Sequence, residues 1–427
     1  MYQPVDAVEV RAWGLRVGAV ALDPGLGYYA FEYYPDWIAR HIELAPLTMP
    51  ARPGRWVFPT LPEATFHRLP ALLADSLPDD FGNALIDAWL ARQGVRREEM
   101  TPLDRLAYMA SRAMGALEFR PSRGPRNRVS SAVELSDLVE GARAMLGGQF
   151  ATDRETESAL QSLIQVGTSA GGARAKAVIA WNRESREIRS GQLPADPGFE
   201  YWLIKLDGIG KDSELGSGES YGRIEYAYSL MARAAGIAMT ECTLLEENDR
   251  AHFMTKRFDR GDDGTKRHTL TLCDLAELDF RQRGVHDYAQ LFSAINDLDL
   301  DSDARAEAFR RMVFNVLARN CDDHTKNHSF LLNSPDADWS LSPAYDVTFA
   351  YNPRGQWTYQ HLMSVNGRFS GIERSDLLAV ADRFQVPAAA RLIAEVGEAI
   401  DHWSEFASTA GVSGEVMDNI RSTYPSL

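Results

Sequence analysis

Apolar and polar residues alternate in two separate parts of the chain, and this pattern constrains the fold more than any other feature of the sequence. The first part is residues 7–35, where AVEVRAWGLRVGAVALD and YYAFEYY flank the turn residues PGLG. The second comprises AKAVIAW, YWLIKLD, MTECTLLEE and AHFMTKRFD, between residues 175 and 259. A repeat of two residues puts alternate side chains on opposite faces of a strand. From about residue 270 helical spacing prevails, so we predict an α+β fold.

Three parts are predicted along the chain. Residues 1–120 form a small unit of strands followed by helices, and the basic stretch RPSRGPRNR then serves as a linker. Residues 121–264 carry a small sheet and one helix, RIEYAYSLMARAAGI, which we expect to end at Gly236. Residues 265–427 are mostly helical. The stretch at 208–222 is rich in Gly and Ser, which predicts a loop.

Composition argues against several classes of protein. The chain has 45 Lys and Arg residues against 60 Asp and Glu, so its net charge of −15 repels the phosphates of nucleic acids. Its three cysteines, Cys242, Cys273 and Cys321, show no C-x-x-C spacing, which fits a reducing compartment. No signal peptide and no apolar run long enough to span a membrane are visible. We therefore expect a soluble, cytoplasmic protein.

A dense group of polar residues, NCDDHTKNHSF, occupies Asn320–Phe330 and allows two interpretations. One is a metal cage, because Asp322, Asp323, His324 and His328 are all potential ligands of a divalent ion. However, the glutamate of a zinc-binding H-E-x-x-H helix is absent, and the preceding RRMVFNVLARN contains no further histidine. The sequence therefore gives the metal cage little support.

The other interpretation is phosphoryl transfer. This chemistry needs an aspartate to orient or deprotonate the attacking hydroxyl, and an asparagine and a second aspartate to hold Mg²⁺ against the phosphates. Asp322 and Asn327 are five residues apart, as are the catalytic aspartate and the metal-binding asparagine of kinases. Asp346, the candidate for the second aspartate, follows the apolar segments FLL and WSL. The alternative is that Asp322 and Asn327 only cap helix ends and that Asp346 lies in an ordinary turn.

The upstream sequence supports phosphoryl transfer. Residues 166–173, VGTSAGGA, can present backbone N–H groups to phosphates without obstruction by side chains. Lys205 lies in an apolar strand and Glu225 near the start of the next helix, as in the ion pair with which kinases grip phosphates. Taken singly, these features fit a tight hairpin and a surface ion pair. Their linear order favours a kinase.

With these residues assembled, the sequence resembles the HipA family of bacterial serine/threonine kinases, the toxins of toxin–antitoxin pairs, over nearly its whole length. VEVRAWGLRVGAVALD, LPALLADSLPDDFGNALIDAW and MGALEF resemble the amino-terminal subdomain of the family. SAGGARAK resembles its phosphate loop, WLIKLD its lysine strand, and IEYAYSLMARAAGI its acidic helix. MTKRFDR, CDDHTKNHSF and SPAYDV resemble its adenine-pocket strand, catalytic loop and metal-binding turn. The resemblance implies a protein-kinase-like fold with a small β-rich lobe, a mostly helical C-lobe and an extra amino-terminal β/α subdomain.

The resemblance also implies roles for individual residues. Asp322 would be the catalytic aspartate, assisted by Lys205 and Glu225, while Asn327 and Asp346 would bind Mg²⁺. Ser169 falls at the serine that family members phosphorylate on themselves. Phosphorylation there would shut off activity, because it adds negative charge to a loop built to bind phosphate. The residues expected at the ATP site are Gly171, Gly172, Ala173, Arg174, Ala175, Lys176, Lys205, Lys256, Arg257, Phe258, His324, Lys326, Asn327, Tyr345 and Asp346.

This chain departs from the family pattern at two positions. Asp323 stands where the family often has glycine, and we expect its side chain to face water because acids are seldom buried without a partner. Lys256 stands where glutamate is common. The neighbouring pair Asp259 and Arg260 could either fix the loop after the sheet or form an ordinary surface ion pair.

The function that the resemblance implies is ATP- and Mg²⁺-dependent phosphorylation of a translation protein such as an aminoacyl-tRNA synthetase, with growth arrest and persistence as consequences. The implied partners are a HipB-like helix-turn-helix antitoxin and, mainly through it, operator DNA. Two alternatives stay open. One is an antitoxin-binding corepressor with little catalysis. The other is a small-molecule phosphotransferase, although Asn320 and Cys321 replace the histidine–glycine pair usual around its aspartate.

Overall fold

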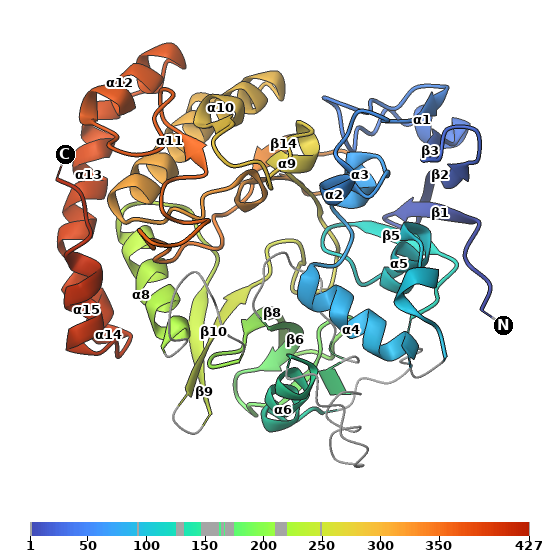
Figure 1. The fold of residues 1–427 in the computed structure, drawn as a ribbon, viewed down its shortest axis with the longest axis horizontal. Helices are drawn as coiled ribbons and strands as arrows, with labels where there is room; N and C mark the ends of the chain where they lie inside the picture. The colour runs from blue at the N-terminus through green and yellow to red at the C-terminus, as the bar shows by residue number, and fades with distance from the viewer. Residues whose placement is uncertain are drawn as a thin grey trace. The chain divides into compact units, whose positions relative to one another are not determined.

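The computed structural model describes residues 2–91, 94–124, 132–146, 162–163, 166, 175–209, 220–247 and 250–426. The chain divides into two compact units. Unit 1 comprises residues 1–210, 256–270 and 331–338, and unit 2 comprises residues 211–255, 271–330 and 339–427. Strands and helices are both abundant (Figure 1), as the α+β prediction requires.

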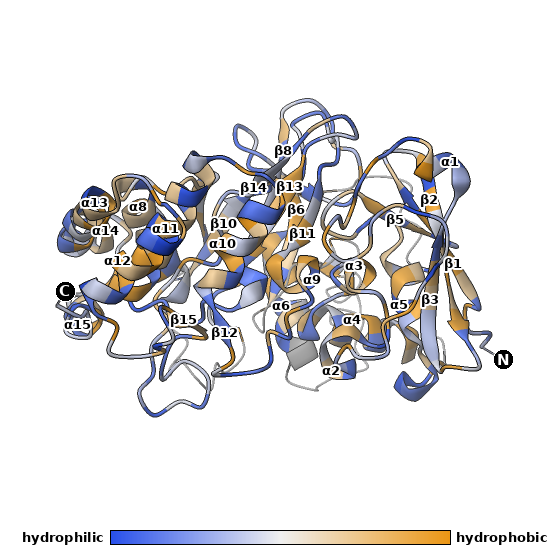
Figure 2. Ribbon diagram, turned by 90° about the horizontal axis from the view of Figure 1, so that it is seen from above, coloured by the Kyte–Doolittle hydropathy of each residue, from blue (hydrophilic) through white to orange (hydrophobic). Residues whose placement is uncertain are grey.

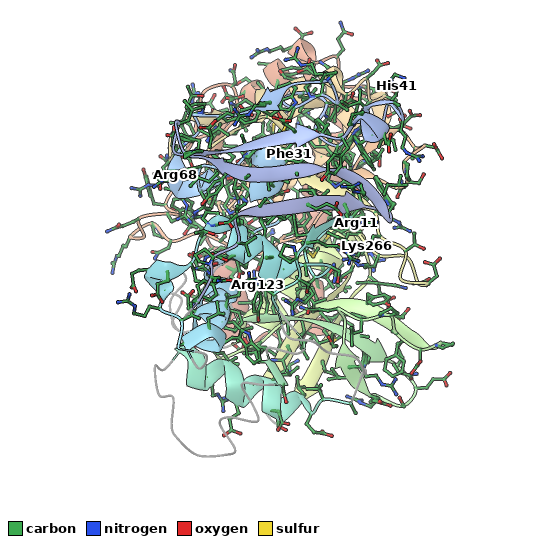
Figure 3. The ribbon with its side chains drawn as sticks, turned by 90° about the vertical axis from the view of Figure 1, so that its right-hand side faces the viewer. Arg11, Phe31, His41, Arg68, Arg123 and Lys266 are labelled. Atoms are coloured by element: carbon green, nitrogen blue, oxygen red, sulfur yellow. The ribbon has the colours of Figure 1, made fainter. Side chains whose placement is uncertain are left out.

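The first sheet of unit 1 is antiparallel and has the strand order β4-β3-β2-β1-β5. Val20 on β2 pairs with both Val8 on β1 and Phe31 on β3, and all three side chains are fully buried. Figure 3 faces this sheet. Its strands are β1 (Ala7–Ala12), β2 (Leu15–Asp23), β3 (Tyr28–Tyr33), β4 (Arg55–Trp56) and β5 (Leu117–Arg120). The predicted strands and the turn between β2 and β3 are therefore confirmed.

Short helices accompany this sheet. Helix α4 begins beside Asp79, whose carboxylate accepts a hydrogen bond from the Gly82 N–H at 2.6 Å. Thr101 caps α5 by accepting a hydrogen bond from the Asp104 N–H. The helices are α1 (Pro35–Ile38), α2 (Glu63–Phe66), α3 (Ala71–Ala74), α4 (Asp80–Ala91), the 3₁₀ helix η1 (Arg97–Glu99), α5 (Pro102–Met109) and α6 (Leu135–Leu146).

Unit 1 also contains three strands of the second predicted sheet. Strand β6 (Lys176–Asn182) pairs antiparallel with β7 (Ile188–Ser190) and with β8 (Phe199–Lys205). Ile179 on β6 lies opposite Trp202 on β8, and both side chains are fully buried. The residues after 255 rejoin this unit, since the Arg257 N–H donates to the Tyr201 carbonyl at 2.9 Å.

Unit 2 is mostly helical. Helix α11 packs against α13, and α8 packs against α14 (Figure 1). Helix α8 (Tyr221–Ala234) is followed by Gly236 at φ +80°, as predicted. The remaining helices are α9 (Leu272–Leu275), α10 (Tyr288–Asp297), α11 (Ser302–Leu317), η2 (Thr325–Asn327), α12 (Arg374–Arg383), α13 (Ala389–Asp401), α14 (Trp403–Thr409) and α15 (Gly414–Arg421).

Among the described strands, those after β10 have four residues or fewer. β9 (Cys242–Glu247) and β10 (Arg250–Lys256) form an antiparallel hairpin. Gly222 lies against this hairpin, because a Cβ atom there would meet the Ala251 carbonyl oxygen at 2.0 Å. The others are β11 (His268–Thr271), β12 (His286–Asp287), β13 (Ser329–Leu332), β14 (Trp339–Leu341) and β15 (Met363–Ser364).

Burial follows the distribution of hydrophobic residues along these elements (Figure 2). In unit 2 the core is centred on α11, where Phe309, Met312 and Phe314 are fully buried. All three cysteines are buried and free. In the part of the chain that the structure describes, no helix combines the length and the apolar character needed to cross a bilayer.

Candidate active site

The polar stretch predicted as a catalytic loop follows the end of α11. Backbone hydrogen bonds fix its start: the Asn320 N–H donates to the Asn315 carbonyl, and the Cys321 N–H donates to the Ala350 carbonyl at 2.9 Å. Its end is the 3₁₀ turn η2, which leads through His328 into β13. The loop is therefore held at both ends by regular structure.

Asp322 and Asn327 lie together, as their spacing suggested. The Asn327 side-chain amide donates to the Asp322 backbone carbonyl at 2.7 Å. The Asp322 side chain keeps 41% of its accessible surface. Neighbouring protein atoms nevertheless shield this carboxyl from water, and this desolvation raises its pKa. The nearby His324 ring and a hydrogen bond from Trp357 partly oppose that shift. Asp322 is thus a partly exposed carboxylate that is more basic than usual.

The metal-binding turn predicted at residues 342–347 approaches the same loop. Asp346 has a left-handed backbone with φ +52°, and its charge helps to raise the pKa of Asp322, which places the two carboxyl groups near each other. The Tyr345 hydroxyl donates to the Lys326 carbonyl at 2.7 Å. The Lys326 ammonium in turn lies 3.4 Å from Asp274. Unit 2 therefore brings together the predicted residues Asp322, His324, Lys326, Asn327, Tyr345 and Asp346.

The prediction that Asp323 faces water is wrong. Its side chain is fully buried and accepts hydrogen bonds from the Tyr288 hydroxyl, His361 Nδ1 and the Leu362 N–H, at 2.8–2.9 Å. Burial by itself opposes ionisation of both groups of the Asp323–His361 pair. Their mutual attraction and the hydrogen bonds around them together outweigh this effect, so the pKa of Asp323 is lowered and that of His361 is raised to about 10. Asp323 is buried because a partner distant in sequence compensates its charge.

This arrangement also bears on the metal-cage alternative. His328 is buried, and burial with the charge of Arg311 lowers its pKa to about 3, so its ring is neutral. Adjacent Asp322 and Asp323 make different contacts, one with Trp357 and one with His361. Within the described residues, no group of three or more His, Cys, Asp and Glu side chains is arranged to hold a metal ion.

Lys176, from the predicted phosphate-binding segment, lies at the start of β6. Its side chain is 2% exposed, and its ammonium lies 3.1 Å from the carboxylate of Asp79 at the beginning of α4. Burial raises the pKa of Asp79, and the lysine charge offsets this shift only in part. Ala175 beside it is fully buried. Ser169 and the segment Gly171–Arg174 fall outside the residues that the structure describes.

The predicted adenine-edge residues are fixed by charged groups of unit 1. Lys256 binds Glu200 and Asp262, each at 2.9 Å. The guanidinium of Arg257 forms two hydrogen bonds, of 2.7 and 2.8 Å, with the fully buried carboxylate of Asp259. Phe258 is half-buried between them. Contact of these residues with a nucleotide stays a prediction.

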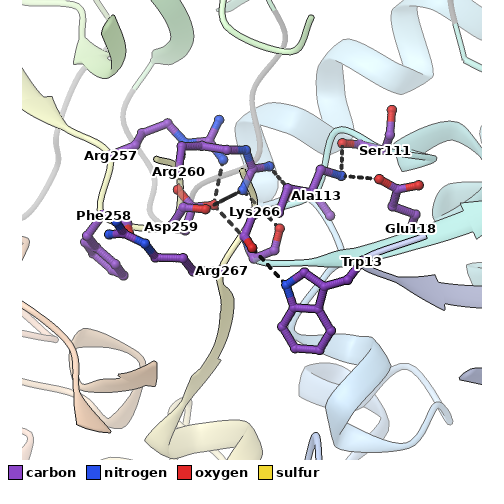
Figure 4. Close-up of polar contacts among 11 residues, drawn as sticks. Trp13, Ser111, Ala113, Glu118, Arg257, Phe258, Asp259, Arg260, Lys266 and Arg267 are labelled. Atoms are coloured by element: carbon purple, nitrogen blue, oxygen red, sulfur yellow. Dashed lines mark hydrogen bonds and ion pairs between the residues drawn. The ribbon is translucent and has the colours of Figure 1, made fainter. Parts of the chain in front are cut away.

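Asp259 and Arg260 form a buried junction rather than a surface ion pair (Figure 4). Asp259 accepts hydrogen bonds from Arg260 at 2.7 Å and from the Gly115 N–H at 2.8 Å, besides those from Arg257. Arg260 also donates to the carbonyls of Gly115 and Ala113. Burial opposes ionisation, but the two arginines hold the pKa of Asp259 far below its usual range. The segment after β10 is thereby attached to residues 113–115.

Lys205 and Glu225 belong to different units. Lys205 is the last residue of β8 in unit 1 and is half-buried. Glu225 is 1% exposed in α8 of unit 2. Their predicted ion pair therefore stays a prediction.

Comparison with known proteins identifies the family. A sequence profile of the HipA-like C-terminal domain matches residues 168–403, and one of the HipA N-terminal domain matches residues 8–120. This chain belongs to the HipA family. The family predicted from the sequence is therefore confirmed. A search of curated proteins finds no match.

Solved structures show which fold this HipA-family chain has. A HipA from Shewanella oneidensis, solved as a toxin–antitoxin complex with HipB and its operator DNA, superposes with a TM-score of 0.67. It is 16% identical, and the match covers 98% of this chain and 94% of that one. A proinflammatory kinase of Helicobacter pylori, CtkA, is 14% identical over 53% of this chain and 88% of that one, with a TM-score of only 0.33. The predicted fold class is confirmed.

Sequence reasoning missed several residues around the site. Trp357 donates its indole N–H to Asp322 Oδ1 at 2.7 Å, and His361 compensates the charge of Asp323. Asp79 compensates that of Lys176. The HipA-like motifs carry no signal for these contacts, because the partners lie far apart in sequence.

Proposed function

We propose that this HipA-family protein is an ATP- and Mg²⁺-dependent serine/threonine protein kinase that acts as a growth-arresting toxin. The observation that carries this proposal is the grouping of Asp322, Asn327 and Asp346 around one loop, with the carboxylate of Asp322 accessible to solvent. Phosphoryl transfer requires a carboxylate that can accept a proton from the substrate hydroxyl, close to oxygen atoms that can bind Mg²⁺.

Asp322 would act as the base. Its raised pKa makes it a better proton acceptor than an ordinary aspartate. Transfer would join the substrate oxygen to the γ-phosphorus of ATP as the bond to the leaving ADP oxygen breaks. The proton of the substrate hydroxyl would pass to the Asp322 carboxylate. No other proton acceptor is required for this step.

The donor atoms of the site fit Mg²⁺. Asn327 and Asp346 offer an amide and a carboxylate oxygen, and Mg²⁺ prefers oxygen ligands and is usually held by few protein groups together with phosphates and water. When bound, the ion would neutralise charge on the phosphates. Hydrogen bonding of the Asn327 amide nitrogen to the Asp322 carbonyl fixes the orientation of that side chain.

We propose that the nucleotide contacts the residues expected from the sequence. We assign the triphosphate to Lys205, with Glu225 as its partner, and to the segment Gly171–Lys176. The adenine would lie along the backbone of Lys256–Phe258. His324, Lys326 and Tyr345 would also contact the nucleotide. The buried contacts of Lys176 and Arg257 suggest that these two residues support the site through their backbone rather than their charged groups.

Autophosphorylation of Ser169 would regulate this activity. A phosphoserine carries nearly two negative charges, which oppose binding of ATP phosphates by the same loop. Lys176 follows that segment in the sequence, and its buried bond to Asp79 fixes the start of β6.

The substrate and partners follow from the family rather than from local motifs. We propose that the substrate is a protein of translation, such as an aminoacyl-tRNA synthetase. Because the HipA of Shewanella oneidensis was solved with HipB and operator DNA, we also propose a HipB-like antitoxin as partner. With a net charge of −15, contact with DNA would come chiefly through that antitoxin.

The test is incubation of phosphatase-treated protein with labelled ATP and Mg²⁺, followed by mapping of phosphopeptides. Asp322→Asn should lower the incorporated label by about a hundredfold or more, whereas Asp382→Asn, on the exposed side of α12, should not. Label at Ser169 in the wild type supports the regulatory step. Absence of both label and ATP binding would refute the kinase and favour an antitoxin-binding corepressor. Transfer only to small molecules would favour a small-molecule phosphotransferase.

A further inference from the structure

The segment Ala350–Leu362, which follows the predicted metal-binding turn, contacts three consecutive residues of the catalytic loop. The carbonyl of Ala350 accepts the Cys321 N–H at 2.9 Å. The indole of Trp357 donates to the Asp322 carboxylate. His361 and Leu362 bind Asp323. All these residues belong to unit 2. One segment thus contacts the backbone of Cys321, the side chain of Asp322 and the side chain of Asp323.

Trp357 lies in a short loop that is closed by its own backbone. The Asn352 N–H donates to the Thr358 carbonyl at 3.2 Å, and the Gly355 N–H donates to the Asn352 carbonyl at 3.0 Å. Arg283 donates to the Gln356 carbonyl. Thr358 is almost fully buried, although its neighbour Tyr359 is 42% exposed. The loop is therefore closed at its base immediately beside Trp357, so the indole is presented from a fixed backbone.

We propose that Trp357 is a positioning residue for Asp322, fixing the orientation of its carboxylate by donating the indole N–H to Oδ1. This inference rests on the proposed kinase function. A carboxylate on a surface loop otherwise rotates about its side-chain bonds. A single N–H donor at 2.7 Å selects one orientation of the carboxylate. In the proposed reaction, the second oxygen would accept the proton of the substrate hydroxyl. The indole has no acceptor, so it cannot itself take the proton.

The first test is kinetic. Trp357→Phe removes the donor and keeps an aromatic ring, so it should lower kcat by roughly 10- to 100-fold, the cost of a misplaced reacting group. KM for ATP should change less than about twofold, because the indole does not hold the nucleotide. Trp357→His restores a ring N–H and should recover part of kcat. Tyr359→Phe is the matched control in the same loop and should behave like the wild type. Unchanged or increased kcat in Trp357→Phe would overturn the proposal. An increase would show that the indole hinders the reaction at Asp322.

The second test needs no activity. The indole ¹H–¹⁵N resonance of Trp357, assigned by its loss in Trp357→Phe, should shift in Asp322→Asn but not in Asp382→Asn. A shift in a protein that transfers no phosphate would confirm the contact and refute the kinase. An active wild type with no such shift would refute the positioning role and leave the kinase standing.

Discussion

The buried ion pair between Asp323 and His361 gives the sharpest prediction of stability. Asp323→Asn preserves shape but removes the charge that compensates His361. The pKa of His361 lies near 10 instead of 6.5, a shift equivalent to roughly 5 kcal/mol of preference for the charged ring. Loss of one partner from a buried ion pair typically costs ~3–5 kcal/mol. We therefore expect Asp323→Asn to lower the free energy of unfolding by about 3–5 kcal/mol at pH 6.

The pH dependence of this contribution follows from the two shifts. Because the folded-state pKa of His361 is raised, its contribution is complete below pH 6.5 and is lost as pH rises toward 10. Because the pKa of Asp323 is lowered, its contribution is present above 3.8 and is lost as pH falls below that value. The difference in stability between the wild type and a variant without the pair should therefore be largest between about pH 4 and 6.5.

Urea unfolding of the wild type, Asp323→Asn, His361→Gln and the double variant provides the assay. The double variant should lose less stability than the two single variants together, because each single change leaves one charge buried alone. Asp382→Asn on the exposed side of α12 should stay within about 0.5 kcal/mol of the wild type. A loss below about 1 kcal/mol in Asp323→Asn, or strict additivity of the two changes, would refute the reasoning.

Three further changes test the packing. Lys176→Met should lower the free energy of unfolding in urea by about 3 kcal/mol, because it leaves the buried carboxylate of Asp79 without its partner. Adding Asp79→Asn should recover most of this loss. No recovery would show that the two groups are not coupled. Gly222→Ala should lower the free energy of unfolding by roughly 1–3 kcal/mol, because its Cβ would meet a β10 carbonyl at 2.0 Å. Gly397→Ala in α13 is the control: its Cβ meets no atom within 4 Å, so it should stabilise the protein slightly. Equal thermal midpoints of the two variants would contradict this. Asp259→Asn should lower the denaturation midpoint strongly, because two buried arginines lose their counter-charge; an unchanged midpoint would show that the junction contributes little.

The parts of the fold that were predictable depend on local patterns. The strands β1–β3 follow from alternating residues, and the end of α8 follows from a glycine in the left-handed region. The closeness of Asp322 and Asn327 was also predictable, because their spacing is that of the catalytic aspartate and metal-binding asparagine in kinases. In each case the responsible interactions act within a few residues of one another.

The parts that could not be predicted depend on contacts between distant residues. Asp323 resembles its neighbour Asp322 in every local respect, yet it is buried by a histidine 38 residues away. Trp357 reaches Asp322 across 35 residues. Burial of a charge depends on whether a partner is present in three dimensions, and a single sequence carries no period or spacing that reports such a partner. The same argument applies to Asp259 and Gly115.

These contacts change how the amino-terminal residues are understood. Residues 1–120 looked like an added subdomain, but their Asp79 and Gly115 supply partners to Lys176 and Asp259, whose charges are buried in the same unit. Lys176 begins β6, opposite Lys205 on β8, and Asp259 follows the predicted adenine edge. Without Asp79, the charge of Lys176 would be left buried and uncompensated, at a cost of several kcal/mol. Without the Gly115 N–H, Asp259 would lose one hydrogen-bond donor but keep its two arginines. The amino-terminal residues are therefore a structural part of unit 1, which also contains the predicted nucleotide-binding residues Lys176, Lys205 and Arg257.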